Sequence, residues 1–234
     1  MNLHGPSLII GAGITAIAIF VSFLAFDNIG DEKELVLEQA ENIQPEPQRI
    51  GLDVFTENGS PYLGNSNAPI TLVEFGDYQC HFCNVYFHNT EHSIIENYVE
   101  TGKLKIIFKD FTIIGPDSIT AAHAAHCADD QGMFWEYHDI LYNNWTGENN
   151  GWASSENLLG FAQQIGLNID EFTECMLSET HSNIITQSNS DARTLGLTGT
   201  PSFFVIGKDN VVTKVHGAQP FENFKKIFDS ELEK

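Results

Sequence analysis

The stretch Ile70-Thr71-Leu72-Val73-Glu74-Phe75, followed after a short turn by Cys80-His81-Phe82-Cys83, decides how this chain is expected to fold. The first segment is nearly all apolar, which indicates a central, buried β-strand. The second opens a segment with helical spacing of apolar residues, which predicts a helix over residues 80–99. Two thiols at a helix start can form and break one disulfide, and the local positive potential favours the first as thiolate. We therefore expect Cys80 to be the exposed attacking thiol and Cys83 the resolving thiol.

Two other interpretations of the Cys80–Cys83 pair are a permanent disulfide and half of a zinc site. A zinc ribbon needs a second close pair of thiols, and the remaining cysteines, Cys127 and Cys175, are far apart in sequence. A CxxC motif that follows a strand in a strand–helix–strand unit favours redox chemistry.

The surrounding sequence predicts a small mixed α/β sheet that is interrupted by helices. An apolar strand over residues 104–111 completes a right-handed parallel βαβ unit with residues 70–75. Another strand with a turn is expected over residues 52–60. Later strands over residues 202–206 and 211–215 are joined by a hairpin turn and followed by a final helix after Pro220.

The region between these strands is expected to be helical. One helix is predicted over residues 118–142, another from Ser155 to near Gly166, and a third from Asp170, running on or breaking before Leu195. The predicted domain boundaries are a membrane anchor or signal segment at residues 1–26, an acidic linker at 27–50, a sheet domain at 51–116 and 197–234, and an inserted helical domain at 117–196.

The segment Ser7 to Phe26 contains no charged residue and, as a helix, is just long enough to cross a bilayer. It is either an uncleaved anchor or a cleavable signal peptide. Its length favours the anchor, as does Leu24-Ala25-Phe26, a poor small-residue cleavage site. Both interpretations place the rest of the chain outside the cytoplasm, and the anchor predicts a single-pass protein of the cell membrane with an extracytoplasmic catalytic domain.

The chain is strongly acidic, with 32 acidic and 11 basic residues and a formal net charge of -21. A nucleic-acid binder needs a basic footprint, so nucleic acid is excluded as a partner. The same charge argues against docking on anionic lipid and names no substrate.

Three further residues near the thiols are candidates for roles in exchange. His81, as a cation, would stabilise the Cys80 thiolate and make the disulfide more oxidising. Phe82 would present an apolar face to protein substrates. Glu74 either is buried and takes the proton of Cys83, with Lys109 on the adjoining strand as its counter-charge, or reaches solvent at the strand end.

Two other motifs have open interpretations. The Thr200-Pro201 bond precedes a strand and is either an ordinary turn or a cis peptide. His123, His126 and Cys127 share a helix face, so a metal site is conceivable, but packing histidines beside a structural cysteine are the favoured interpretation. The four cysteines permit a second disulfide, Cys127–Cys175, which would close a long loop.

The segment from Val73 to Cys83 resembles the active-site region of DsbA-like thiol:disulfide oxidoreductases of the thioredoxin superfamily. Pro61-Tyr62-Leu63-Gly64 resembles the lead-in of many members, and residues 199–205 resemble the family's cis-proline segment. The resemblance covers the chain from about Gly51 onward. It implies a thioredoxin fold with an inserted helical domain, here preceded by an N-terminal transmembrane helix.

The resemblance also implies roles for individual residues. Cys80 would be the nucleophile, Cys83 the resolver and Glu74 the buried acid, with Lys109 as its basic partner. Thr200 and Pro201 would form the loop that faces the disulfide and pairs with substrate backbone. Cys127 and Cys175 resemble a second, structural disulfide of some members. The chain departs from the family in one respect, because many members carry Pro-His where this chain has His81-Phe82.

The sequence therefore predicts an extracytoplasmic protein disulfide oxidoreductase that introduces disulfides into exported proteins with reduced cysteines. It would use no cofactor and no metal, and the family implies reoxidation by a membrane quinone-linked thiol oxidase. Isomerase or reductase activity on the same scaffold is the first alternative, since a threonine before the cis-proline also occurs in isomerase-like relatives. A metal-binding or copper-delivery protein is the second.

Overall fold

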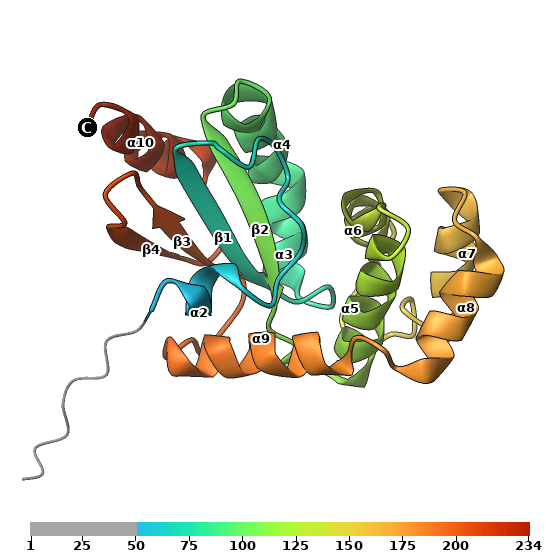
Figure 1. Ribbon diagram of the computed structural model, residues 1–234. Helices are drawn as coiled ribbons and strands as arrows, with labels where there is room; N and C mark the ends of the chain where they lie inside the picture. Colours follow the sequence, from blue (N-terminus) through green and yellow to red (C-terminus); the bar gives the residue numbers. More distant parts are fainter. Residues whose placement is uncertain (1–50) are drawn as a thin grey trace, which may run out of the picture. The chain divides into compact units, whose positions relative to one another are not determined.

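A mixed four-stranded sheet forms the centre of the computed structural model, which describes residues 51–234 (Figure 1). The strand order is β2-β1-β3-β4. Strand β1 (Ile70–Gly76) pairs in parallel with β2 (Leu104–Asp110) and antiparallel with β3 (Ser202–Ile206), and β3 pairs antiparallel with β4 (Val212–His216). The predicted βαβ unit and the later pair of strands are thus confirmed.

The crossover from β1 to β2 is one continuous helical segment, as the spacing of apolar residues predicts. It comprises α3 (His81–Tyr86), the π-helical η1 (Phe87–Glu91), α4 (His92–Ile94) and the π-helical η2 (Ile95–Val99). This segment and the C-terminal α10 (Phe221–Leu232) cover one face of the sheet, where Tyr86, Phe203 and Phe224 share a core.

The opposite face of the sheet is covered by α2 (Asp53–Thr56) and α9 (Ser182–Thr194), which enclose a smaller core around Phe75 and Phe204. Residues 52–56, predicted as a strand, form this α2 instead. The helix turns Phe55 inward, where its ring centroid lies 4.9 Å from that of Phe204. Tertiary packing of one aromatic side chain outweighs the strand-like alternation of the short segment.

The remaining helices lie between β2 and β3 and stand beside the sheet in Figure 1. They are α5 (Pro116–Asp129), α6 (Phe134–Asn143), α7 (Ser155–Gln164) and α8 (Ile169–Ser178), and α9 leads back to the sheet. The single helix predicted over residues 118–142 is wrong, because the chain turns at Gly132, whose φ is 72°. The third predicted helix breaks at Glu179, where φ is 50°.

The predicted membrane segment (residues 1–26) and acidic linker (27–50) lie outside the described residues. Within residues 51–234, no helix combines the length and the apolar character that crossing a membrane requires.

Candidate active site

Cys80 and Cys83 lie where the turn after β1 enters α3, with Cys80 as the N-cap residue. The turn is fixed by the buried Asp77, whose carboxylate accepts hydrogen bonds from the amides of Gln79 (2.9 Å), Ile113 (2.8 Å) and Ile114 (3.0 Å). Sequence reasoning missed Asp77, although an acidic residue directly after a buried strand is a signal for such a turn. The carboxylate therefore joins the active-site turn to the segment that follows β2.

Both active-site sulfurs are free thiols, and both residues are more enclosed than the sequence suggests. Cys80 is 4% exposed and Cys83 is 0% exposed. The prediction that Cys80 is exposed is therefore wrong, although Cys80 is the more accessible of the two. His81 and Phe82 are exposed instead, Phe82 at 60%. The turn thus presents an aromatic and an imidazole side chain beside a largely buried sulfur.

The surroundings shift the pKa values of the two thiols in opposite directions. A hydrogen bond from Cys83 lowers the pKa of Cys80 most, and the Thr200 side chain and the amides of Cys83 and Phe82 lower it further. These interactions outweigh burial and bring the pKa of Cys80 to about 6. Burial raises the pKa of Cys83 well above its ordinary value, and the hydrogen bond with Cys80 raises it more. Cys80 is therefore a thiolate at neutral pH while Cys83 keeps its proton.

Thr200 and Pro201 approach the pair from the start of β3. Their peptide bond is cis, and Cys80 Sγ lies 3.4 Å from the Thr200 carbonyl oxygen, to which it donates when the thiol is protonated. Residues 120 positions apart in sequence thus meet at the sulfur. This arrangement places a strand end directly beside the reactive atom.

Glu74 is buried on the sheet face that carries the active-site helix and is 1% exposed, so it does not reach solvent. The prediction that Lys109 is the partner of Glu74 is wrong. Glu74 lies opposite Phe108 in the β1–β2 register, and neighbouring residues of a strand point to opposite faces. Lys109 therefore points away and binds Asp191 of α9 at 2.7 Å.

Burial raises the pKa of Glu74 well above its ordinary value, and the nearby charges of Glu91 and Cys80 raise it further. A carboxyl group in this state holds a proton at a pH where exposed carboxyl groups have lost theirs. The charge of Glu74 in turn raises the pKa of the buried Cys83 thiol.

The loop between α6 and α7 holds the active-site turn from the other side, and sequence reasoning missed this contact. The Trp145 indole donates to the Gln79 carbonyl at 2.9 Å, and the Asn149 amide donates to the Gln79 side chain at 2.8 Å. The Glu148 carboxylate accepts from the His81 amide at 3.0 Å. The inserted helices thus supply hydrogen-bond partners to the residues on both sides of Cys80.

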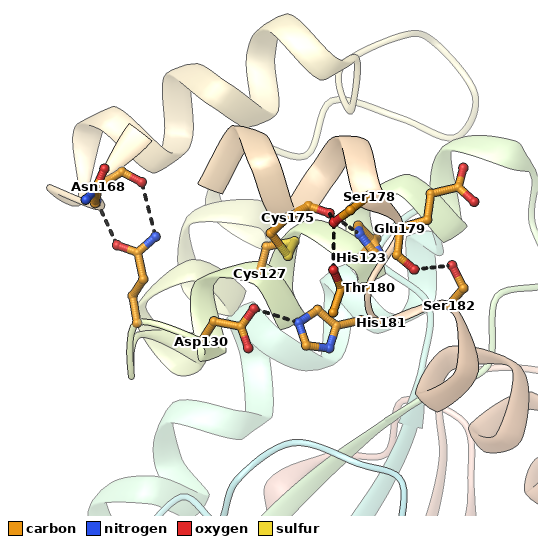
Figure 2. Close-up of a disulfide and its surroundings, with 11 residues drawn as sticks. His123, Cys127, Asp130, Asn168, Cys175, Ser178, Glu179, Thr180, His181 and Ser182 are labelled. Carbon is orange, nitrogen blue, oxygen red and sulfur yellow. Dashed lines mark hydrogen bonds and ion pairs between the residues drawn. A yellow bond between two sulfur atoms is a disulfide. The ribbon is translucent and has the colours of Figure 1, made fainter. Parts of the chain in front are cut away.

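The other cysteines, Cys127 of α5 and Cys175 of α8, are joined by a disulfide (Figure 2). His123 stands beside it with Nε2 3.1 Å from the Cys175 carbonyl oxygen, and His126 binds Asp110 at 2.7 Å. The nitrogen and sulfur atoms of His123, Cys127 and Cys175 lie within 4.8 Å of one another, but sulfurs in a disulfide offer no thiolate to a metal. This histidine cluster is therefore part of the packing around the disulfide.

Comparison with known proteins agrees with this geometry. A sequence profile of the thioredoxin family matches residues 56–230. The chain is 26% identical over 224 residues to the probable disulfide bond formation protein D of Bacillus cereus, covering 94% of this chain and 93% of that protein.

Crystal structures with a similar fold include the following two. The first is oxidised BdbD from Bacillus subtilis, with a TM-score of 0.68 and 22% identity over 79% of this chain and 96% of that chain. At this level of identity the similarity shows only that the two folds are alike. The second is alpha-DsbA1 from Wolbachia pipientis, with a TM-score of 0.66 and 27% identity over 75% of this chain and 91% of that chain. The chain therefore belongs to the thioredoxin family, as a DsbA-like thiol:disulfide oxidoreductase.

Proposed function

We propose that the protein acts outside the cytoplasm and introduces disulfides into exported proteins through Cys80 and Cys83. The observation that carries this proposal is the unequal ionisation of the two sulfurs. A thiolate at Cys80, with a pKa of about 6, stabilises the reduced form of the pair. Stabilising the reduced form makes the disulfide form the stronger oxidant. The name of the Bacillus cereus relative, a probable disulfide bond formation protein, supports the same direction.

The reaction begins with the Cys80–Cys83 disulfide. A substrate thiolate attacks Cys80 Sγ, the bond between the two enzyme sulfurs breaks, and Cys83 leaves as a thiolate. Because the Cys83 pKa is raised, its sulfur takes a proton, and Glu74 is the buried group that supplies it. A second substrate thiolate then attacks the mixed disulfide and releases Cys80 as a thiolate. The substrate has lost two electrons and the enzyme has gained them.

The surface around Cys80 would receive the substrate. Thr200 and Pro201 would pair with substrate backbone beside the sulfur, and Phe82 would offer an apolar contact. His81 would add positive charge near the thiolate when protonated. Cys127–Cys175 would hold the inserted helices together without taking part in exchange.

The chain would be organised as the sequence predicts, with residues 1–26 anchoring the protein in the cell membrane and 27–50 as a linker. Residues 51–116 and 197–234 would form the thioredoxin-like domain, and 117–196 the inserted helical domain. A quinone-linked thiol oxidase of the membrane would then remove two electrons from the reduced pair.

The test is oxidation of a reduced, unfolded protein by purified wild-type, Cys80→Ser and Cys83→Ser chains. We expect Cys80→Ser to lose activity entirely, and reduced Cys83→Ser to form a stable mixed disulfide with a protein disulfide at Cys80. Full activity in Cys80→Ser would refute the proposal. Equilibration with glutathione separates oxidase from reductase, since a potential near the roughly −270 mV of thioredoxin would indicate a reductase.

A further inference from the structure

Each half of the proposed cycle moves one proton at a sulfur that solvent does not reach. Cys83 is 0% exposed and Glu74, its proton partner, is 1% exposed. The Cys80 thiolate is a poor proton acceptor, because its pKa is about 6. The proton that Glu74 gives up must therefore be replaced from solvent by another route, and it must leave again when the pair is reoxidised.

The side chains around Glu74 leave several buried polar atoms without a hydrogen-bond partner in the described part of the chain. Glu74 lies between Phe108 and Phe203 on one sheet face, and the Phe108 ring centroid is 5.0 Å from that of His138. Among the buried atoms without a partner are Glu74 Oε1, Tyr86 Oη, Glu91 Oε2, His138 Nε2 and Tyr142 Oη. The charges of Glu74 and Glu91 both raise the pKa values of Tyr86 and Tyr142, which places these groups near one another. Such atoms are costly unless water or a neighbouring group satisfies them, so their presence together indicates a polar interior around Glu74.

Glu91 is the member of this group that connects the interior with the surface. Its Oε1 lies 3.6 Å from His138 Nε2, and His138 Nδ1 is 3.1 Å from the Tyr78 hydroxyl. Its backbone belongs to η1, on the same helical segment as Cys83. The charge of Glu91 raises the pKa of Glu74, second in effect to burial.

On its outer side, Glu91 forms part of a pocket of about 370 Å³. The pocket also contains His88, His92 and Asp139, all titratable groups, and none of these residues belongs to the surface around Cys80. Glu91 itself is only 2% exposed, so it lies at the inner wall of the pocket. It is therefore placed between the buried acid and a polar opening.

We propose that Glu91 relays the proton between Glu74 and this pocket, so that substrate and proton use different openings. The inference rests on the proposed role of Glu74 in exchange. When substrate attacks Cys80, Glu74 gives its proton to Cys83 Sγ and Glu91 delivers a replacement from the pocket. When the pair is reoxidised, the oxidant is first joined to Cys80 as a mixed disulfide, and Glu74 passes its proton through Glu91 to the pocket. Cys83 then gives its proton to Glu74 as its sulfur attacks Cys80 Sγ, the bond between Cys80 and the oxidant breaks, and the oxidant sulfur leaves as a thiolate. Glu91 acts through Glu74 and does not touch the reacting sulfurs.

The experiment measures single-turnover oxidation of the reduced protein by glutathione disulfide, with acid quench and mass spectrometry to separate the mixed disulfide from the closed Cys80–Cys83 bond. Glu91→Gln is expected to slow closure at least tenfold while leaving formation of the mixed disulfide at Cys80 unchanged. Glu96→Gln, the same charge change at an exposed residue of the same helical segment, is expected to close at the wild-type rate.

Chemical rescue distinguishes a relay from a structural role. Glu91→Ala is expected to be slow, and formate or imidazole, small enough to enter the pocket, is expected to restore its closure rate. The inference would be overturned if Glu91→Gln closed the Cys80–Cys83 bond at the wild-type rate. It would also be overturned if Glu91→Ala closed slowly and neither formate nor imidazole accelerated it. If the wild-type chain still forms its Cys80–Cys83 disulfide in the same experiment, the proposed function stands even when the relay fails. If the wild-type chain does not form this disulfide, the proposed function and the relay are both refuted.

Discussion

Cys80 and Cys83 belong to the same helical turn, yet their surroundings stabilise the thiolate form of Cys80 and the protonated form of Cys83. Cys80 receives hydrogen bonds that favour its charge, and Cys83 is enclosed by apolar and acidic groups that oppose charge. The reduced pair therefore carries one negative charge at neutral pH and one proton. This state sets both the direction of exchange and its dependence on pH.

The reduction potential of the pair is expected to show a break near pH 6, where Cys80 titrates. Below the break, reduction takes up two protons with two electrons, and the potential falls by about 59 mV per pH unit. Above it only Cys83 takes a proton, and the slope falls to about 30 mV per pH unit. Equilibration with glutathione between pH 5 and pH 8, followed by alkylation of free thiols, measures the slope. A constant slope of about 59 mV across this range would contradict the assignment.

Glu74→Gln is expected to make the protein more stable at neutral pH and to slow closure of the Cys80–Cys83 bond. Burial raises the pKa of Glu74 above its ordinary value of 4.5, so the folded state binds this proton more tightly than the unfolded chain. The bound proton contributes its full share to the free energy of unfolding below pH 4.5, the pKa of this group in the unfolded chain. That share is lost as the pH rises through the pKa of Glu74 in the folded protein. In this window the wild type should lose up to about 1.4 kcal/mol per pH unit relative to the variant.

Urea unfolding of both oxidised proteins at several pH values measures this difference, and the oxidised form avoids titration of the two thiols. Parallel pH profiles for wild type and Glu74→Gln would show that the buried acid does not titrate as described.

The reactive residues could be located from sequence because their signals are local. A CxxC after an apolar strand and a proline before another strand mark Cys80, Cys83 and Pro201. The partner of Glu74 could not be found in this way. Strand register decides that Lys109 faces the opposite side of the sheet, and register depends on how two distant strands align.

At the scale of elements, the inserted helices serve the active site through the loop between α6 and α7. Trp145, Glu148 and Asn149 bind the turn that carries Cys80. No sequence pattern predicts this contact, because the two segments are about 66 to 70 residues apart and meet only after the helices have packed. The helices themselves were predictable, although their breaks at Gly132 and Glu179 were not, since each depends on a single left-handed residue.

Cys127→Ala together with Cys175→Ala is expected to lower the free energy of unfolding by about 2–4 kcal/mol. The disulfide closes a loop of 48 residues between α5 and α8, and its loss frees the unfolded chain. The potential of Cys80–Cys83 is expected to stay the same, because neither Cys127 nor Cys175 is among the groups that shift the pKa values of the two thiols. Thermal unfolding and glutathione equilibration measure the two quantities, and a changed potential would contradict a purely structural role.

At the scale of the whole described region, Lys109 joins three elements that are distant in sequence. Its ammonium group, 0% exposed, donates to Asp191 of α9 and to the carbonyl oxygens of Val54, within α2, and Glu57, the C-cap of α2. Burial lowers the pKa of Lys109, while the bond with Asp191 opposes this shift. The short α2 and the last inserted helix are thus held against the same strand that lies beside the active-site strand.

Asp191→Ala is expected to destabilise the protein by about 3–5 kcal/mol, because it leaves a buried ammonium group without its counter-charge. Adding Lys109→Met removes that charge, so the double variant is expected to regain part of the loss. It should not regain all of it, since the carbonyl groups of Val54 and Glu57 then lose their donor. Urea unfolding of the wild type, both single variants and the double variant gives the coupling energy. If Asp191→Ala and the double variant were equally stable, the ion pair would not be what holds α2 and α9 to the sheet.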